Sequence, residues 1–106
     1  MLRFIKKLFG GAPKADVKTL VAKGAIIVDV RSPREYQGGH VKGSLNYPLD
    51  TLRNHLDEFK KKGKPVITVC RSGARSGMGR NMLKEHGVEA YNGGPWDSVQ
   101  QKLNEQ

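Results

Sequence analysis

The sequence predicts an α/β domain in which helices flank a mainly parallel sheet. Two runs rich in β-branched residues, 26–30 and 65–69, are typical of strands buried on both faces. Segments with helical spacing separate these runs, and strands that alternate with helices form parallel βαβ units with right-handed crossovers. The length of 106 residues is that of one small domain.

The first elements follow from apolar spacing and from residues that stop a helix. A helix is expected at 15–23, where apolar side chains recur at helical spacing before Gly24. The strand at 26–30 comes next. Residues 31–39 are then expected to form a loop that contains one helical turn, which Pro33 would start.

The middle of the chain predicts a short strand and one continuous helix. Residues 44–47 favour the strand, which Pro48 would end. Asp50 fits the N-cap of the helix, and Gly63 ends it. The apolar stripe of this helix consists of Leu49, Leu52, Leu56 and Phe59.

The last third of the chain places a cysteine at the end of a strand. Strand 65–69 leads directly into Cys70. A helix is expected at about 75–86, a third strand at 88–91 and a final helix at 96–103.

Polar residues follow each of the three main strands. They are 29–31 after the first, Cys70 after the second and 92–94 after the third. Parallel sheets bind ligands outside the carboxyl ends of their strands, so this edge is the expected site.

The loop from Cys70 to Ser76 carries the strongest chemical signal. It reads Cys70-Arg71-Ser72-Gly73-Ala74-Arg75-Ser76. Small residues and a glycine allow successive backbone N–H groups to turn inward as an anion-binding nest, and the next helix adds its positive N-terminal end. This environment lowers a cysteine pKa from about 8.5, so Cys70 is predicted to be a thiolate nucleophile that needs no histidine base. The alternative is a buried, inert cysteine, which would not need such a loop.

Composition restricts the classes of function. The single cysteine excludes an internal disulfide and a thiolate-rich metal site, so no metal or cofactor is expected. A free thiol that must stay reduced favours the cytoplasm. The net charge of +9 suits small anionic substrates. Nucleic-acid binding is not expected, because the lysines are scattered and no aromatic residues accompany a basic cluster.

The first 12 residues differ from the rest. They form a basic amphipathic segment and a Gly-Pro hinge before a domain expected at 13–106. No stretch is apolar enough to cross a membrane. The segment is expected to be a short helix packed on the domain, with weak peripheral contact to anionic lipid as the alternative.

The loop and its flanking motifs resemble the single-domain rhodaneses, the thiosulfate sulfurtransferase family. The family loop reads Cys-x-x-Gly-x-Arg-Ser, and residues 70–76 match it. The resemblance covers about 15–104. The other matching motifs are Asp29-Val30-Arg31, Glu35-Tyr36, Gly39-His40-Val41-Lys42-Gly43-Ser44, Asn46-Tyr47-Pro48, Asn92-Gly93-Gly94 and Trp96.

The resemblance implies a rhodanese-like three-layer fold and a reaction in two halves. Cys70 would take the outer sulfur of thiosulfate as a persulfide and pass it to cyanide or to a thiol, possibly that of a protein. The implied substrate-binding residues are Arg71, Ser72, Gly73, Ala74 and Arg75. Their backbone N–H groups would stabilise the persulfide, and the two arginine side chains would attract the anion.

Structural roles are expected for the other matching positions. Asp29, Arg31 and Glu35 are expected to form a polar brace, and His40 to pack and hydrogen-bond locally. His55 and His86, on helices, are expected to face solvent. Two glycines should permit close packing of the helix after the loop, Gly77 and Gly79.

Two other functions remain open at this point. A cysteine-dependent phosphatase or arsenate reductase usually has five residues between its cysteine and arginine, whereas four separate Cys70 from Arg75. The shorter loop suits a sulfur atom better than a phosphoryl group. A module that only relays persulfide sulfur or docks a partner protein is the other alternative.

Overall fold

The computed structural model describes residues 16–105, so the expectations for the first 12 residues lie outside the described part of the chain. The helices are α2 (Val17–Ala22), α3 (Pro33–Gln37), α4 (Leu49–Leu52), the 3-10 helix η1 (Arg53–His55), α5 (Leu56–Lys62), α6 (Ala74–Glu85) and α7 (Trp96–Asn104). The strands are β1 (Ile26–Asp29), β2 (Leu45–Asn46), β3 (Val66–Cys70) and β4 (Ala90–Pro95).

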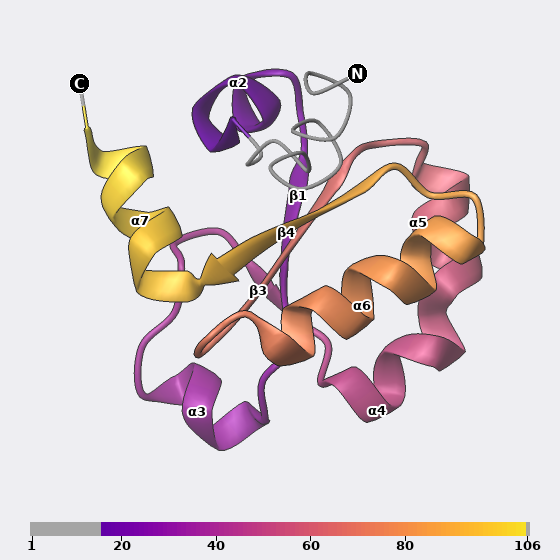
Figure 1. The fold of residues 1–106 in the computed structure, drawn as a ribbon, viewed down its shortest axis with the longest axis horizontal. Helices are drawn as coiled ribbons and strands as arrows, with labels where there is room; N and C mark the ends of the chain where they lie inside the picture. Colours follow the sequence, from indigo (N-terminus) through magenta and orange to yellow (C-terminus); the bar gives the residue numbers. More distant parts are fainter. Residues whose placement is uncertain (1–15, 106) are drawn as a thin grey trace, which may run out of the picture.

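The four strands form one parallel sheet in the order β2-β1-β3-β4 (Figure 1). The two β-branched runs pair with each other, with Ile27 opposite Ile67. Every residue of β3 is buried, as a central strand between two covered faces requires. The predicted α/β class with a parallel sheet is therefore confirmed.

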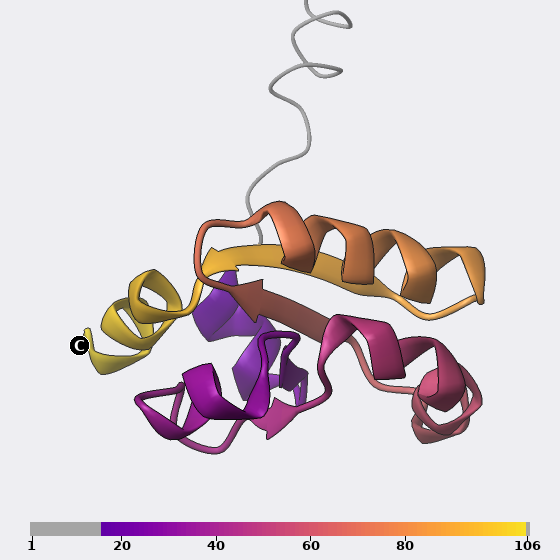
Figure 2. The same ribbon diagram turned by 90° about the horizontal axis from the view of Figure 1, so that it is seen from below.

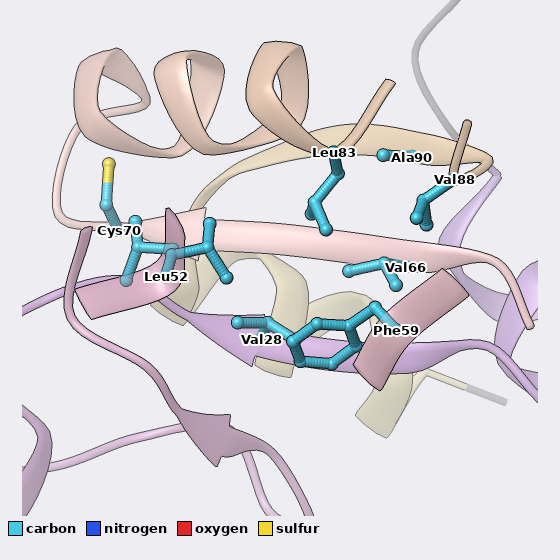
Figure 3. Close-up of a cluster of buried hydrophobic side chains, with 9 residues drawn as sticks. Val28, Leu52, Phe59, Val66, Cys70, Leu83, Val88 and Ala90 are labelled. Atoms are coloured by element: carbon cyan, nitrogen blue, oxygen red, sulfur yellow. The ribbon is translucent and has the colours of Figure 1, made fainter. Parts of the chain in front are cut away.

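Helices cover both faces of the sheet, giving three layers (Figure 2). On one face Ile27, Ile67 and Val69 pack against residues of α2 and α7. On the other face the core lies under α4, α5 and α6 (Figure 3), and it contains Val28, Val30, Leu52, Phe59, Val66, Cys70, Leu83, Val88 and Ala90. Neighbouring residues of one strand thus pack into the cores on opposite faces of the sheet, because side chains alternate along a strand.

The single helix predicted after Pro48 is broken into α4, η1 and α5. His55 has φ −123° and ψ 11°, outside the helical region, and this interrupts the hydrogen-bond ladder. The prediction that Asp50 is the N-cap was wrong. Pro48 holds that position, and its carbonyl accepts hydrogen bonds from the N–H groups of Thr51 and Leu52, so Asp50 lies inside the first turn.

The last strand also differs from the prediction. It was expected at 88–91, with the polar residues 92–94 following it, but β4 runs from Ala90 to Pro95. A bulge shifts the register between Thr68 and Val69 of β3. Gly93 lies there so close to β3 that an added Cβ would be 2.8 Å from Cγ2 of Ile67. Pairing with β3 therefore extends the strand through glycines that normally indicate a loop.

No helix within residues 16–105 is long and apolar enough to span a membrane. In the same part of the chain, no three side chains of His, Cys, Asp or Glu gather closely enough to hold a metal ion.

Candidate active site

The loop that follows β3 reverses the chain within three residues. β3 ends at Cys70 and α6 begins at Ala74. The turn depends on Gly73, whose φ of 111° is accessible to glycine at little cost. An added Cβ at Gly73 would also lie 3.7 Å from Cα of Gly94, so the loop packs against the bulged strand β4. The predicted glycine-bearing loop is therefore present at the carboxyl edge of the sheet.

The sulfur of Cys70 points towards the start of α6 and is held there by hydrogen bonds (Figure 3). The backbone N–H of Gly73 donates to Sγ at 2.9 Å, and the hydroxyl of Ser76 lies 3.2 Å from it. Cys70 is only 1% exposed. A buried sulfur that keeps these partners is held in one position relative to the helix start.

Burial raises the pKa of Cys70, but hydrogen bonds outweigh it and the pKa lies below its ordinary value. The hydroxyl of Ser76 makes the largest lowering contribution, followed by the backbone N–H groups of Ser76, Gly73 and Ser72. These groups stabilise the charged form of the thiol, which is the reactive one.

Ser76 connects the sulfur to β4. The hydroxyl has a single proton, which goes to Oδ1 of Asn92 at 2.7 Å when Cys70 is a neutral thiol that donates to Oγ, and which turns to Sγ when Cys70 is ionised. Oδ1 of Asn92 also accepts the N–H of Gly94 at 3.0 Å. The side-chain amide of Asn92 then donates to the carbonyl of Gly73 at 3.1 Å. Asn92 therefore fastens the loop and orients the hydroxyl that contacts Cys70. Sequence reasoning gave neither residue this role, although the position of Asn92 after a predicted strand was a signal.

The two arginines of the loop have different surroundings. Arg75 forms two hydrogen bonds with the carboxylate of Glu35, at 2.8 and 3.0 Å. Arg71 is exposed and has no ion pair among residues 16–105. Both were predicted to attract an anion. Arg75 pairs with Glu35, whereas Arg71 has no such pair in the described part of the chain, and the anion-binding role of both stays a prediction.

Most of the chain matches a described protein family. The family model for the Rhodanese-like domain matches residues 14–97. The chain belongs to this family. The predicted resemblance to the rhodaneses and the predicted three-layer fold are therefore both confirmed.

Relatives of this rhodanese-like domain include named sulfurtransferases. It is 39% identical over 69 residues to the uncharacterized protein YqhL of Bacillus subtilis (strain 168), covering 64% of this chain and 54% of that protein. It is 34% identical over 61 residues to the thiosulfate sulfurtransferase PspE of Escherichia coli (strain K12), covering 57% and 59%. The chain thus spans less than two thirds of these relatives.

Solved structures show the same fold. A structure described as rhodanese with anions from E. coli has a TM-score of 0.64 and 30% identity, covering 70% of this chain and 89% of that one. The human single-domain sulfurtransferase TSTD1 has a TM-score of 0.65 and 23% identity, covering 91% and 100%.

The remaining motif residues of the rhodanese-like domain support the site. Arg31 donates to both carboxylate oxygens of Asp29 and to the carbonyl of Gly39, and its guanidinium lies 5.0 Å from the ring centroid of Trp96. This pair is the predicted brace. Glu35 does not belong to it, because its carboxylate turns to Arg75 and to the N–H of Ser32.

The predicted roles of the histidines and glycines hold with one refinement. Nδ1 of His40 contacts the carbonyl of Tyr36 at 2.7 Å, and the two rings stack. His55 and His86 are only partly exposed, since each contacts a carboxylate of α5. At Gly79 an added Cβ would lie 3.3 Å from Leu52, so the glycine does permit close packing of α6.

Proposed function

We propose that this chain is a sulfurtransferase that moves sulfur from thiosulfate, or a related small anionic donor, to a thiophilic acceptor. Cys70 carries the sulfur between the two as a persulfide. The observation that carries the proposal is the sulfur of Cys70, held by the N–H of Gly73 and the hydroxyl of Ser76 at the start of α6. Named thiosulfate sulfurtransferases among the relatives support the choice of donor.

The first half-reaction uses the thiolate directly. Sγ of Cys70 attacks the outer sulfur of thiosulfate and forms a new S–S bond. The original bond of thiosulfate breaks, and its electron pair leaves with sulfite. The N–H groups that stabilise the thiolate are also suited to the negative charge of the resulting persulfide.

The second half-reaction regenerates the enzyme. Cyanide, or the thiol of a small molecule or a protein, attacks the outer sulfur of the persulfide. The electron pair of the broken bond returns to Sγ of Cys70. The cycle needs no cofactor and no side-chain base, because the nucleophile is stabilised as a thiolate before the donor arrives. A thiol that must stay reduced suits the cytoplasm, where we place the reaction.

Intact-protein mass spectrometry tests this proposal. Thiosulfate should add the mass of one sulfur atom to the full chain, and cyanide or a thiol reductant should remove it. The Cys70→Ser variant should neither gain the mass nor form thiocyanate. Turnover by that variant would refute the assignment, because the chain has no second cysteine. Loading of the wild type without turnover by any acceptor would instead indicate a relay module.

A further inference from the structure

The hydroxyl of Ser76 lies between two acceptors and can donate to only one of them at a time. Its oxygen is 3.2 Å from Sγ of Cys70 and 2.7 Å from Oδ1 of Asn92. A thiolate has no proton of its own, so it takes the hydrogen bond of Ser76 and Oδ1 of Asn92 loses it. Whenever Sγ carries no charge, the hydroxyl turns back to Asn92.

The side chain of Asn92 keeps its place whichever way the hydroxyl points. Its Oδ1 also accepts the N–H of Gly94 at 3.0 Å, and its Nδ2 donates to the carbonyl of Gly73 at 3.1 Å. An added Cβ at Gly77 would lie 3.2 Å from Nδ2 of Asn92, so the amide packs closely against the start of α6. The acceptor beside Ser76 is therefore fixed, and only the proton changes direction.

The charge on Sγ changes twice in the reaction cycle of the proposed function. Free Cys70 is a thiolate. Its attack on thiosulfate turns Sγ into a neutral sulfur with two covalent bonds, and the negative charge of the persulfide lies on the outer sulfur. Transfer of the outer sulfur to the acceptor returns the electron pair and the charge to Sγ. The thiolate thus needs the hydroxyl of Ser76 before loading and after transfer, but the persulfide leaves it without a partner on Sγ.

We propose that Asn92 is a positioning residue for sulfur transfer, whose Oδ1 accepts the hydroxyl of Ser76 while Cys70 carries the persulfide and releases it when the thiolate re-forms. This proposal rests on the proposed function. Because Asn92 gives the hydroxyl a partner in the loaded state, it stabilises the persulfide relative to the free thiolate. It stabilises the neutral thiol in the same way, so Asn92 opposes ionisation of Cys70, whereas Ser76 promotes it.

The charged groups around the sulfur belong to other side chains. The pKa of Arg75, on α6, is raised by its hydrogen bonds to Glu35 of α3 and also by the charge of the thiolate. At the end of β1, Arg31 pairs with Asp29. Arg71 is exposed in the loop. Alanine substitution of an uncharged asparagine or serine leaves all these charges in place and changes only hydrogen bonds.

A double-mutant cycle isolates the effect that passes through the hydroxyl. The pH midpoint of Cys70 alkylation is measured in the full chain for the wild type, Asn92→Ala, Ser76→Ala and the double variant. Asn92→Ala also loses the hydrogen bonds to Gly73 and Gly94, but this loss occurs in both backgrounds and cancels in the cycle. The coupled part should lower the midpoint by about 0.4 to 1 pH unit when Ser76 is present, the size of one ordinary hydrogen bond.

Sulfur loading gives a second readout. At a fixed ratio of sulfite to thiosulfate, and at a pH above the alkylation midpoint, intact-protein mass spectrometry measures the ratio of persulfide to free chain. Asn92→Ala should lower this ratio about threefold to tenfold in the presence of Ser76, and the decrease should disappear in the Ser76→Ala background. Asn54→Ala, which changes an exposed asparagine of η1, is the control and should alter neither readout.

Two results would overturn the proposal. One is an equal shift of the midpoint by Asn92→Ala with and without the hydroxyl of Ser76, and the other is an unchanged loading ratio in Asn92→Ala. Failure of the proposed function is distinct from both, because the wild type itself would then gain no sulfur from thiosulfate.

Discussion

The guanidinium of Arg75, in the first turn of α6, forms a bidentate ion pair with the carboxylate of Glu35, 40 residues earlier in the chain. The pair links the start of the helix that follows Cys70 to α3, on the other side of the carboxyl edge of the sheet. The ion pair holds the first turn of α6 in place, and this turn also carries Ser76, whose hydroxyl contacts the sulfur of Cys70.

The pair should make stability depend on acidity. The hydrogen bonds from Arg75, followed by the N–H of Ser32, lower the pKa of Glu35 from 4.5 to about 2. A carboxyl whose pKa is lowered on folding stabilises the protein above its unfolded pKa, and this contribution is lost as the pH falls from about 4.5 towards 2. Glu35→Gln should lower Tm at pH 7 by a few degrees, since partly exposed pairs contribute up to about 1 kcal/mol.

Calorimetry between pH 7 and pH 2 checks this prediction. The difference in Tm between the wild type and Glu35→Gln should shrink as the solution becomes acidic. Glu85→Gln, which changes an exposed acid at the end of α6, is the control and should have little effect. A constant difference across the pH range would contradict the role of the ion pair.

The hydroxyl of Ser76 should control the ionisation of the thiol. In the wild type, the pH midpoint of Cys70 alkylation should lie below the value of about 8.5 for a free cysteine. Ser76→Ala removes the hydrogen bond that lowers the pKa most, so its midpoint should move upward. Alkylation at pH 7 should slow about tenfold or more, as expected for loss of a hydrogen bond to a charged group. A midpoint at or above 8.5 in the wild type would refute the activated thiolate.

The two arginines should respond differently to substitution. Arg71→Ala should raise KM for thiosulfate several-fold without changing Tm, because it removes an exposed cation with no ion pair in the described chain. Arg75→Ala should lower Tm as well, since Glu35 loses its partner. Steady-state kinetics at two salt concentrations, with the exposed Arg34→Ala as control, separates the two effects. Identical behaviour of the two arginine variants would show that the ion pair has no structural role.

The bulge in β4 should tolerate no side chain at Gly93. A methyl group there would lie 2.8 Å from Cγ2 of Ile67 and 3.0 Å from the carbonyl oxygen of Thr68. Gly93→Ala should therefore destabilise the domain by about 1–3 kcal/mol, the usual size of overpacking. Gly38→Ala is the matched control, because Gly38 has ordinary helical φ and ψ and no contact closer than 3.4 Å. Chemical denaturation of both variants measures the difference, and equal stabilities would contradict the packing argument.

Much of the fold could be predicted because its signals are local. Runs 26–30 and 65–69 are β-branched throughout most of their length, and both are central strands. Gly73 could be assigned to a turn because a left-handed backbone conformation restricts the choice of residue. The position of Cys70 at the end of a strand then followed from the sequence order alone.

The link between the sulfur and β4 could not be predicted in the same way. Asn92 reaches Ser76 and Gly73 only because a bulge sets the register of β4 against β3. A register depends on pairing between distant segments, which periodicity in one segment does not report. The break at His55 was missed for a related reason, since the apolar stripe continues across it.

Three main-chain N–H groups donate hydrogen bonds to the sulfur of Cys70, and they belong to Gly73, Ser72 and Ser76. A substitution other than proline leaves a main-chain N–H in place. Arg71, Ser72 and Ala74 are exposed on the outside of the loop, so their side chains can be exchanged without removing these donors. Under the proposed function, reactivity and donor selectivity would therefore be encoded separately in this loop. A library randomised at these three positions offers a direct route to altered donor preference with the nucleophile preserved.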